Sequence, residues 1–320
     1  MRKILSHKKL MIGVFILAGL LVAVLMFTSK RPDPEPKRIS MVVYADTAER
    51  WDNIREGASL ACSTNNAKLN LITMLSEYDP YEQEEIIDRE IADGADALII
   101  APCSSARIRE YVDAKKLHIP VVYLESLEDA LPTDICIAAD DYKMGYELGE
   151  KIAEEESDIV TVAILSGNDG RDSVRLREQG LRDAITGKAG KIINWPGSRY
   201  GADERTAIQK YIVSEATDVI VTFDNSTTDA LLDALTNLGH NARVYCISTS
   251  NKAVYNLYSR GVNMLEYTDE FSMGYLAAMH ALDHAYATGR YSHKQIEYRM
   301  VRKENMYDED NQTLLFPFVD

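Results

Sequence analysis

Cysteine is scarce in this sequence, and the few cysteines form no recognisable motif. The four lie far apart, with neither a CxxC pair nor the spacing of a zinc site: Cys62, Cys103, Cys136 and Cys246. Only His280 and His284 stand four residues apart on an expected helix, and no glutamate follows His280 as an HExxH site requires. We therefore expect buried thiols and no metal site, while the sequence leaves a disulfide open.

Motifs of common catalytic and nucleotide sites are missing too. The chain has no GxSxG elbow, no GxxxxGK[ST] loop and no GxGxxG after an expected strand. Asp140 and Asp141 are neighbouring carboxylates, but neighbours on a strand point to opposite faces, so we expect them to begin a helix. The sequence predicts a protein that is not an enzyme and needs no cofactor.

Acidic residues outnumber basic ones outside the first thirty residues. The net charge is -15, although residues 1–30 hold five Lys or Arg and no acid, so the rest of the chain is more acidic still. Because this part of the chain is acidic, it repels the phosphates of nucleic acids, and we expect no nucleic-acid partner. With 320 residues, 46% of them hydrophobic, the chain is long enough for two cores, because single domains usually hold about 100–200 residues.

An uncharged apolar run occupies residues 10–27 and would span roughly 27 Å as a helix, close to the hydrocarbon thickness of a bilayer. Basic residues precede it, which favours a cytoplasmic N-terminus. We predict that residues 1–30 form a cytoplasmic tip and a transmembrane anchor in the cell membrane, with the body extracytoplasmic. A cleaved signal peptide is the alternative, although no A-x-A pattern follows the run. Three prolines then make residues 31–38 an extended linker.

From residue 39 the pattern alternates short apolar, β-branched runs with stretches of helical period, which is typical of parallel βαβ units. The first set predicts strands at 39–44, 69–75, 96–101 and 120–124, and helices at 48–64, 81–93 and 104–117. The second set predicts strands at 159–165, 190–195, 218–223 and 243–247, and helices at 171–186, 202–215 and 226–238, with a late helix at 271–288. Two sets of about 100 residues indicate an α/β protein of two similar lobes.

Five local stretches, in order and at matching separations, resemble the type I periplasmic binding proteins of the ribose and galactose group. They are 93–103 (DGADALIIAPC), 116–125 (KLHIPVVYLE), 137–149 (IAADDYKMGYELG), 175–185 (RLREQGLRDAI) and 222–235 (TFDNSTTDALLDAL). The resemblance implies two Rossmann-like lobes with parallel sheets, joined by a hinge, and a ligand held in the cleft between them. Lobe 1 would hold 39–139 plus about 269–289, and lobe 2 would hold 140–268 plus about 290–320.

The same resemblance implies eight ligand-binding residues: Arg50, Trp51, Ser104, Arg175, Tyr200, Asp224, Ser248 and Asp269. Several have a second interpretation. Trp51 is also compatible with a core position, and Ser104 and Asp224 with helix N-caps. Arg171 and Arg177 are neighbouring alternatives to Arg175, as Arg199 is to Tyr200.

Three positions depart from the sugar-binding pattern, so the ligand cannot be carried over from ribose. Ser104 and Ser248 stand where an aspartate is usual, and Thr268-Asp269 where a glutamine is usual; Asp269 would then supply the missing carboxylate. We expect a protein that closes on a small polar ligand, a sugar, and presents it to a sensor histidine kinase or an ABC permease. An anionic ligand such as a sugar phosphate or sugar acid, and a membrane-anchored hydrolase on a similar frame, are the alternatives.

Overall fold

In the computed structural model, Lys37–Asp320 forms one compact unit. The structure describes residues 35–46, 49–128, 134–156, 160–197, 204–236, 238, 240, 242–286 and 295–316. The predicted anchor at 10–27 and the candidate residue Tyr200 lie outside these ranges. Among the described helices, none combines the length and apolar character needed to cross a membrane.

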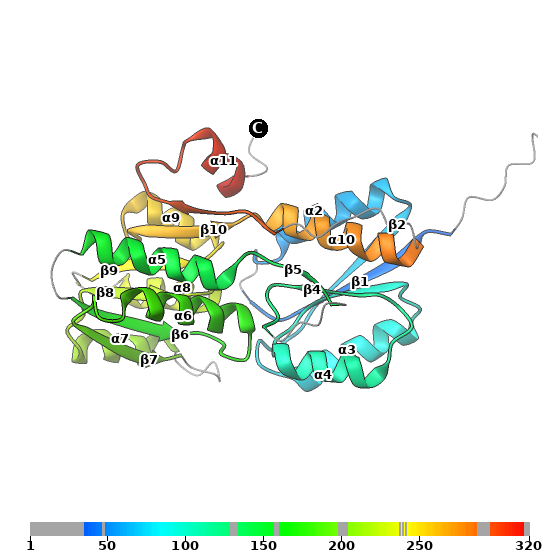
Figure 1. Cartoon of the computed structure of the whole chain (residues 1–320), viewed down its shortest axis with the longest axis horizontal. Helices are drawn as coiled ribbons and strands as arrows, with labels where there is room; N and C mark the ends of the chain where they lie inside the picture. Colours follow the sequence, from blue (N-terminus) through cyan, green and yellow to red (C-terminus); the bar gives the residue numbers. More distant parts are fainter. Residues whose placement is uncertain are drawn as a thin grey trace, which may run out of the picture. The chain divides into compact units, whose positions relative to one another are not determined.

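The first lobe is built on a five-stranded parallel sheet in the order β2-β1-β3-β4-β5. Its strands are β1 (Lys37–Val43), β2 (Ala67–Thr73), β3 (Ala97–Ala101), β4 (Val121–Leu124) and β5 (Ile135–Ile137). Its helices are α2 (Asp52–Thr64), α3 (Pro80–Ala92), α4 (Ser105–Lys115) and the late helix α10 (Glu270–Tyr286). Helices α2 and α10 lie together on one side of the sheet and α3 and α4 on the other (Figure 1). Because both faces are covered, β3 is buried along its whole length.

The second lobe is built on a six-stranded sheet in the order β11-β10-β9-β8-β6-β7. Its strands are β6 (Thr161–Ser166), β7 (Lys191–Pro196), β8 (Val219–Thr222), β9 (Arg243–Ile247), β10 (Met264–Thr268) and β11 (Tyr298–Val301), and only β11 runs antiparallel to its described neighbour. Its helices are α5 (Asp141–Glu155), α6 (Asp172–Ile185), α7 (Glu204–Ser214), α8 (Asn225–Leu235), α9 (Asn251–Ser259) and α11 (Glu309–Leu315). The protein thus has two α/β lobes with mainly parallel sheets.

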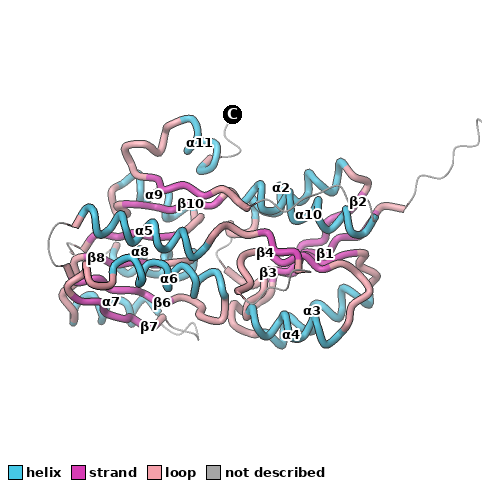
Figure 2. The backbone as a smooth tube through the Cα atoms, in the orientation of Figure 1, coloured by secondary structure: helices cyan, strands magenta, loops and turns pink. Residues whose placement is uncertain are grey.

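Two pairs of helices pack closely enough to require glycine. In α2, a Cβ at Gly57 would lie 2.0 Å from the carbonyl oxygen of Phe271 in α10. In α5, a Cβ at Gly145 would lie 1.8 Å from the carbonyl oxygen of Arg177 in α6. The side-by-side course of each pair is visible in Figure 2. A side chain at either glycine would force its two helices apart.

The chain passes between the lobes in segments that hydrogen-bond to one another. It leaves the first sheet after Ile137 and returns after Thr268 to form α10, and the order of elements requires a third passage before β11. Two backbone hydrogen bonds link these passages, from the Ile296 N–H to the Ala138 carbonyl (3.0 Å) and from the Asp269 N–H to the Glu297 carbonyl (2.9 Å). These crossings form the predicted hinge region.

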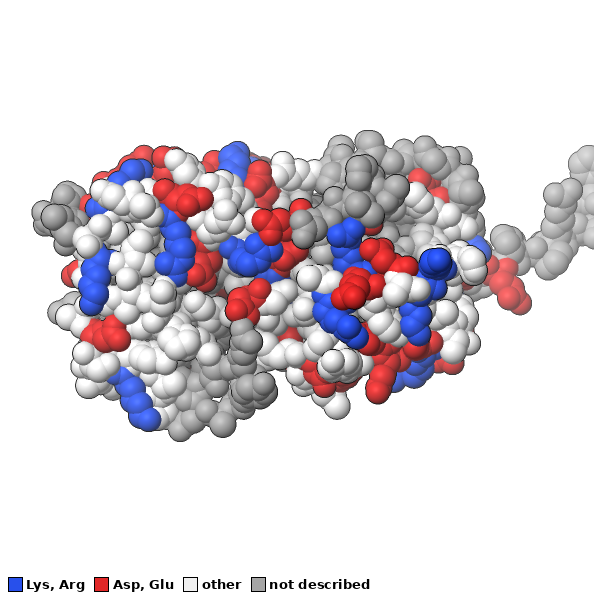
Figure 3. Space-filling view, turned by 60° about the horizontal axis from the view of Figure 1, so that its bottom comes forward, with Lys and Arg blue, Asp and Glu red and all other residues white. Residues whose placement is uncertain are grey.

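Acidic and basic side chains are interspersed on the face of the molecule shown in Figure 3. Exposed ion pairs occur among the described residues, such as Lys115 with Asp88 (2.7 Å). Exposed pairs of this kind contribute little to stability. Charged side chains are also buried between the lobes, where solvent screens them much less.

Candidate functional site

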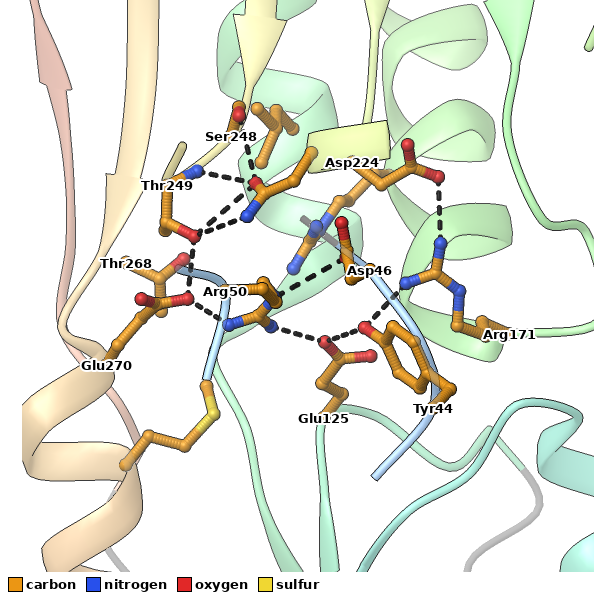
Figure 4. A pocket seen from close by; sticks show the side chains of 14 residues that line it. Tyr44, Asp46, Arg50, Glu125, Arg171, Asp224, Ser248, Thr249, Thr268 and Glu270 are labelled. Carbon is orange, nitrogen blue, oxygen red and sulfur yellow. Dashed lines mark hydrogen bonds and ion pairs between the residues drawn. The ribbon is translucent and has the colours of Figure 1, made fainter. Parts of the chain in front are cut away.

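A small polar cavity lies where the carboxyl ends of both sheets meet (Figure 4). The first lobe contributes Tyr44, Asp46, Arg50, Glu125, Glu270 and Met273, and the second contributes Arg171, Arg177, Asp224, Asn225, Ile247, Ser248, Thr249 and Thr268. Five of them end a strand or follow it directly, and three more follow a strand by two residues, which is the usual ligand position in open parallel sheets. The cavity measures about 20 Å³, room for about one water molecule.

Arg50 organises the first-lobe wall of the cavity. Its guanidinium donates to Glu125 Oε1 (2.7 Å) and to the Glu270 carboxylate, and its Nε lies 3.8 Å from Asp46 Oδ2. The same group stacks over the Trp51 ring at 4.5 Å. One buried cation therefore serves three buried carboxylates.

Arg171, at the N-cap of α6, reaches from the second lobe into the first. Its Nη1 donates to the Tyr44 hydroxyl (2.6 Å), and its Nη2 donates to Glu77 Oε1 (2.8 Å) and to Asp224 Oδ2 (2.9 Å). Tyr44 and Glu77 belong to the first lobe and Asp224 to the second. Arg171 is 2% exposed, so these are desolvated contacts that hold the two lobes together.

Arg177 completes the second-lobe wall. It donates to Asp141 Oδ1 (2.7 Å) and to the carbonyl oxygen of Phe223 (2.8 Å). Asp141 also accepts from the Ser126 hydroxyl (2.5 Å). The hydrogen bond between Ser126 and Asp141 adds a further link across the lobes, since Ser126 follows β4 of the first lobe and Asp141 begins α5 of the second.

The carboxylates of the site differ in how well they are neutralised. Burial alone would raise the pKa of Glu125, but Arg50, Arg171 and Arg177 outweigh it and lower that pKa to about 2. Burial raises the pKa of Glu270 to about 7, although Arg50 opposes the rise. Burial also raises the pKa of Glu77 to about 8, against the opposing effect of Arg171. Glu125 faces three guanidiniums whereas Glu77 and Glu270 face mainly one each, which explains the opposite directions.

Uncharged polar groups line the second-lobe side. Asn225 Oδ1 accepts from the Ser248 hydroxyl (2.9 Å) and from the Thr249 N–H (2.8 Å), and Thr249 Oγ1 donates to Glu270 Oε1 (2.6 Å). Asp224 caps α8 by accepting from the Thr227 N–H (2.9 Å) while it also binds Arg171. Asp224 therefore caps α8 and lines the cavity at the same time.

The structure brings three of the predicted site residues to the cavity: Arg50, Asp224 and Ser248. Trp51 does not line it. Its side chain is 5% exposed, donates from Nε1 to the Tyr44 carbonyl (2.9 Å) and meets the Tyr44 ring edge-on at 4.9 Å. Trp51 is thus a core residue that supports Tyr44 and Arg50 from behind.

Ser104, Arg175 and Asp269 also lie away from this cavity. Ser104 and Arg175 line a separate groove of about 540 Å³. Arg175 stands in the first turn of α6 and pairs there with Glu128 (2.5 Å) and Asp172 (2.6 Å), which leaves the cavity to Arg171 and Arg177. Asp269 accepts from the Ser272 N–H (2.9 Å) at the start of α10, and its neighbour Glu270 supplies the cavity carboxylate instead.

The sequence reasoning did not single out Tyr44, Asp46, Glu77, Glu125, Asn225, Thr249 and Glu270. A positional signal existed for some of them. Tyr44 ends the predicted strand at 39–44 and Glu125 directly follows the predicted strand at 120–124, so a survey of every polar residue at the carboxyl end of a predicted strand would have found them. Glu125 also has a left-handed backbone (φ +65°), which is uncommon for a non-glycine residue.

Comparison with known proteins agrees with this architecture. The family described as periplasmic binding protein domain matches residues 39–289, and the chain belongs to this family. A D-ribose/D-allose-binding protein of Pseudomonas aeruginosa is 22% identical over 250 residues, which is 75% of this chain and 78% of that protein.

Solved structures show the same fold at low identity. A carbohydrate transporter solute-binding protein of Agrobacterium radiobacter, in complex with D-arabinose, has a TM-score of 0.77 at 17% identity and covers 88% of this chain and 99% of its own. An ABC transporter solute-binding protein of Agrobacterium vitis with bound D-fucose has a TM-score of 0.80 at 17% identity, covering 87% and 100%. The XylFII–LytSN complex has a TM-score of 0.75 at 16% identity, covering 85% and 99%.

Proposed function

We propose that this chain is an extracytoplasmic solute-binding protein, held at the membrane through the apolar run at 10–27, that closes its two lobes on a small polar ligand of the sugar class. It binds the ligand and does not transform it. The observation that carries the proposal is the polar cavity between the lobes, in a chain whose residues 39–289 match a family of binding proteins.

The cavity walls suit a ligand rich in hydroxyl groups. Asn225, Ser248, Thr249 and Asp224 offer neutral and charged partners from the second lobe. Arg171 Nε is buried and has no hydrogen-bond partner among the described residues, so one donor remains for a ligand oxygen. A buried donor without an acceptor is costly, and a ligand that accepts from it stabilises the site.

Binding requires movement of the lobes. A cavity of about 20 Å³ holds no sugar, so the contacts of Arg171 with Tyr44 and Glu77 must break for a ligand to enter. A ligand that then contacts both lobes favours the closed arrangement through its higher affinity for it. The membrane partner recognises the surface that the closed form presents.

The partner is a sensor kinase or an ABC permease in the same membrane. The tether favours the sensing role, because a protein held in the membrane beside its partner does not diffuse to deliver a ligand. A protein of this fold was solved as the XylFII–LytSN complex, so assembly with a second polypeptide is compatible with the fold.

A thermal-shift screen of the full-length chain in mild detergent tests the sugar class. The panel should hold pentoses, hexoses, amino sugars, polyols, sugar acids and sugar phosphates. A ligand present at 100 times its dissociation constant should add about 2.7 kcal/mol to the stability of the protein. Stabilisation by members of the sugar series is the expected result, and no shift with any member of the panel would refute the proposal.

A further inference from the structure

Two helices of opposite lobes begin without a side-chain cap of their own. Helix α4 begins at Ser105 and helix α6 at Asp172, and neither N-cap residue, Ser104 or Arg171, caps its helix with a side-chain hydrogen bond. The first N–H groups of a helix have no partner inside the helix, so water or another part of the chain must accept from them. In this protein the acceptors come from the other lobe.

The starts of the two helices bind one another across the lobes. The Ser105 N–H donates to the Gly170 carbonyl oxygen (2.8 Å), and the Asp172 N–H donates to Ser105 Oγ (3.0 Å). The Asp172 side chain adds a third bond, since its Oδ2 accepts from the Glu128 N–H of the first lobe (2.8 Å). Ser105 is 2% exposed, so water has little access to the two bonds that it makes.

Asn168 strengthens this contact from the turn between β6 and α6. Its Nδ2 donates to two first-lobe carbonyl oxygens, those of Glu77 and Cys103 (3.1 Å each), while its Oδ1 accepts from the Gly170 N–H (3.0 Å). The side chain is buried, and a Cβ at Gly170 would lie 3.5 Å from the Cys103 carbonyl oxygen, so the two backbones approach closely here. We call these contacts the interlobe clasp; it is made by Glu77, Cys103, Ser105 and Glu128 of the first lobe and Asn168, Gly170 and Asp172 of the second.

The interlobe clasp holds the lobes together without a ligand. None of its residues lines the polar cavity, and its bonds join one lobe directly to the other. Each of these bonds has a backbone atom at one end or both, so the clasp fixes the distance between the lobes. At this distance the cavity measures about 20 Å³ and holds no sugar. The clasped form and a sugar-bound form therefore exclude one another.

We propose that the interlobe clasp maintains a closed resting form of the ligand-free protein, and that this form competes with the ligand. The ligand enters when the clasp opens, and the lobes then close on the ligand at a wider separation. The clasped fraction lowers the apparent affinity, because only the remaining fraction can bind. The competition rests on the proposed function, whereas the clasp itself does not.

Hydrogen exchange of the ligand-free, full-length chain, measured at single amides, tests the clasp. The Ser105 and Asp172 amides donate across the lobes, so their protection reports the clasp, whereas the Ile108 N–H donates within α4 to the Ser104 carbonyl (3.0 Å) and reports the helix. In the native protein the Ser105 and Asp172 amides should exchange at least tenfold more slowly than amides of an unfolded chain. Exchange at the rates of an unfolded chain would overturn the proposal.

Asn168→Asp removes the donors of the clasp and keeps the turn. The new carboxylate can still accept from the Gly170 N–H, but it presents an oxygen instead of an N–H group to the carbonyl oxygens of Glu77 and Cys103. Gln179→Glu, at an exposed position of α6, makes the same change from amide to carboxylate and is the matched control.

In Asn168→Asp the Ser105 and Asp172 amides should exchange at least fivefold faster than in the native protein, with Ile108 unchanged. Gln179→Glu should leave all three amides unchanged. Ser105→Ala tests the clasp from the first lobe: it removes the acceptor of the Asp172 N–H and should also speed exchange there at least fivefold. Native exchange rates in both clasp variants would contradict the proposal, and loss of protection at Ile108 would identify a variant that is unfolded, which leaves the decision to the other.

The sugar that gives the largest thermal shift tests the competition. By titration calorimetry it should bind Asn168→Asp at least threefold more tightly than the native protein, with Gln179→Glu unchanged, and it should speed exchange at Ser105 in the native protein. Equal or weaker binding to Asn168→Asp, or slower exchange at Ser105 with the sugar, would overturn the competition and leave the solute-binding proposal intact. If no sugar binds, the proposed function and the competition are both refuted, and exchange in the ligand-free chain still decides the clasp.

Discussion

Replacing Glu77 by glutamine should remove a large part of the pH dependence of the protein's stability. Burial raises the pKa of Glu77 from its ordinary value of 4.5 to about 8, with Asp224 adding to the rise and Arg171 opposing it. The folded protein therefore holds this proton more tightly than the unfolded chain does. The resulting stabilisation is fully present below about pH 4.5 and is lost as the pH rises through about 8.

The magnitude follows from the shift. One pKa unit corresponds to about 1.36 kcal/mol, so this single carboxyl accounts for a loss of at most roughly 2 kcal/mol between pH 6 and pH 8. The raised pKa of Glu270, about 7, acts in the same direction, so part of the dependence should survive in the variant.

Urea unfolding of the full-length chain at pH 6 and pH 8 measures the effect, with the buried tryptophans Trp51 and Trp195 as fluorescent probes. The free energy of unfolding of the native protein should fall over this interval, and that of Glu77→Gln should fall by roughly 2 kcal/mol less. Glu85→Gln should behave like the native protein, since its side chain is exposed. An identical fall in Glu77→Gln and the native protein would refute the reasoning.

Two further substitutions test the packing and the ion pairs, both by urea unfolding. Arg171→Met should lower stability by about 3–5 kcal/mol because it leaves two buried carboxylates without their cation, whereas Arg175→Met, at a 40% exposed side chain, should cost less than about 1 kcal/mol. Equal losses of stability in Arg171→Met and Arg175→Met would show that the buried ion pairs of Arg171 contribute no more than the exposed ion pairs of Arg175. Gly57→Ala should cost about 1–3 kcal/mol, since the added Cβ meets an α10 carbonyl oxygen at 2.0 Å. The exposed Ser63→Ala on the same helix should stay within about 0.5 kcal/mol, and a neutral Gly57→Ala would contradict the observed packing.

Much of the fold could be read from the sequence because most strands are short apolar runs with clear helical stretches between them. The expected strand at 96–101 corresponds to β3, and Gly94, which directly follows the expected helix at 81–93, has the left-handed backbone (φ +85°) that glycine tolerates. Asp140 was expected to begin a helix, and it caps α5 by accepting from the Lys143 N–H.

Strand β10 of the second lobe was missed for a physical reason. Strand β10 contains Glu266, an acid in a strand that is buried throughout, and neither of its carboxylate oxygens has a hydrogen-bond partner among the described residues. Burial raises the pKa of Glu266 well above its usual range. An acid interrupts the apolar pattern by which a buried strand is recognised, so this strand could not be recognised from the pattern alone.

The site was less accessible to sequence reasoning than the fold. Arg50 and Trp51 are neighbours in the sequence. Only the direction of the backbone before α2 determines that the Arg50 side chain enters the cavity and that the Trp51 side chain packs in the core. Arg171 and Arg175 are separated by one turn, and the partners that surround each of them decide which one spans the lobes. The carboxyl groups that Arg50 contacts, those of Asp46, Glu125 and Glu270, come from three separate segments, which no local pattern joins.

Ligand-driven closure of the two lobes is the central claim, and a distance measurement tests it most directly. Cysteines introduced at the exposed positions Tyr81 on α3 and Val213 on α7 would carry spin labels on opposite lobes of the full-length chain. Burial raises the pKa of all four native thiols, so they should label poorly: Cys62, Cys103, Cys136 and Cys246. With the sugar that gives the largest thermal shift, the account predicts that a broad distribution of distances narrows to a single distance. A distribution that saturating ligand leaves unchanged would contradict it.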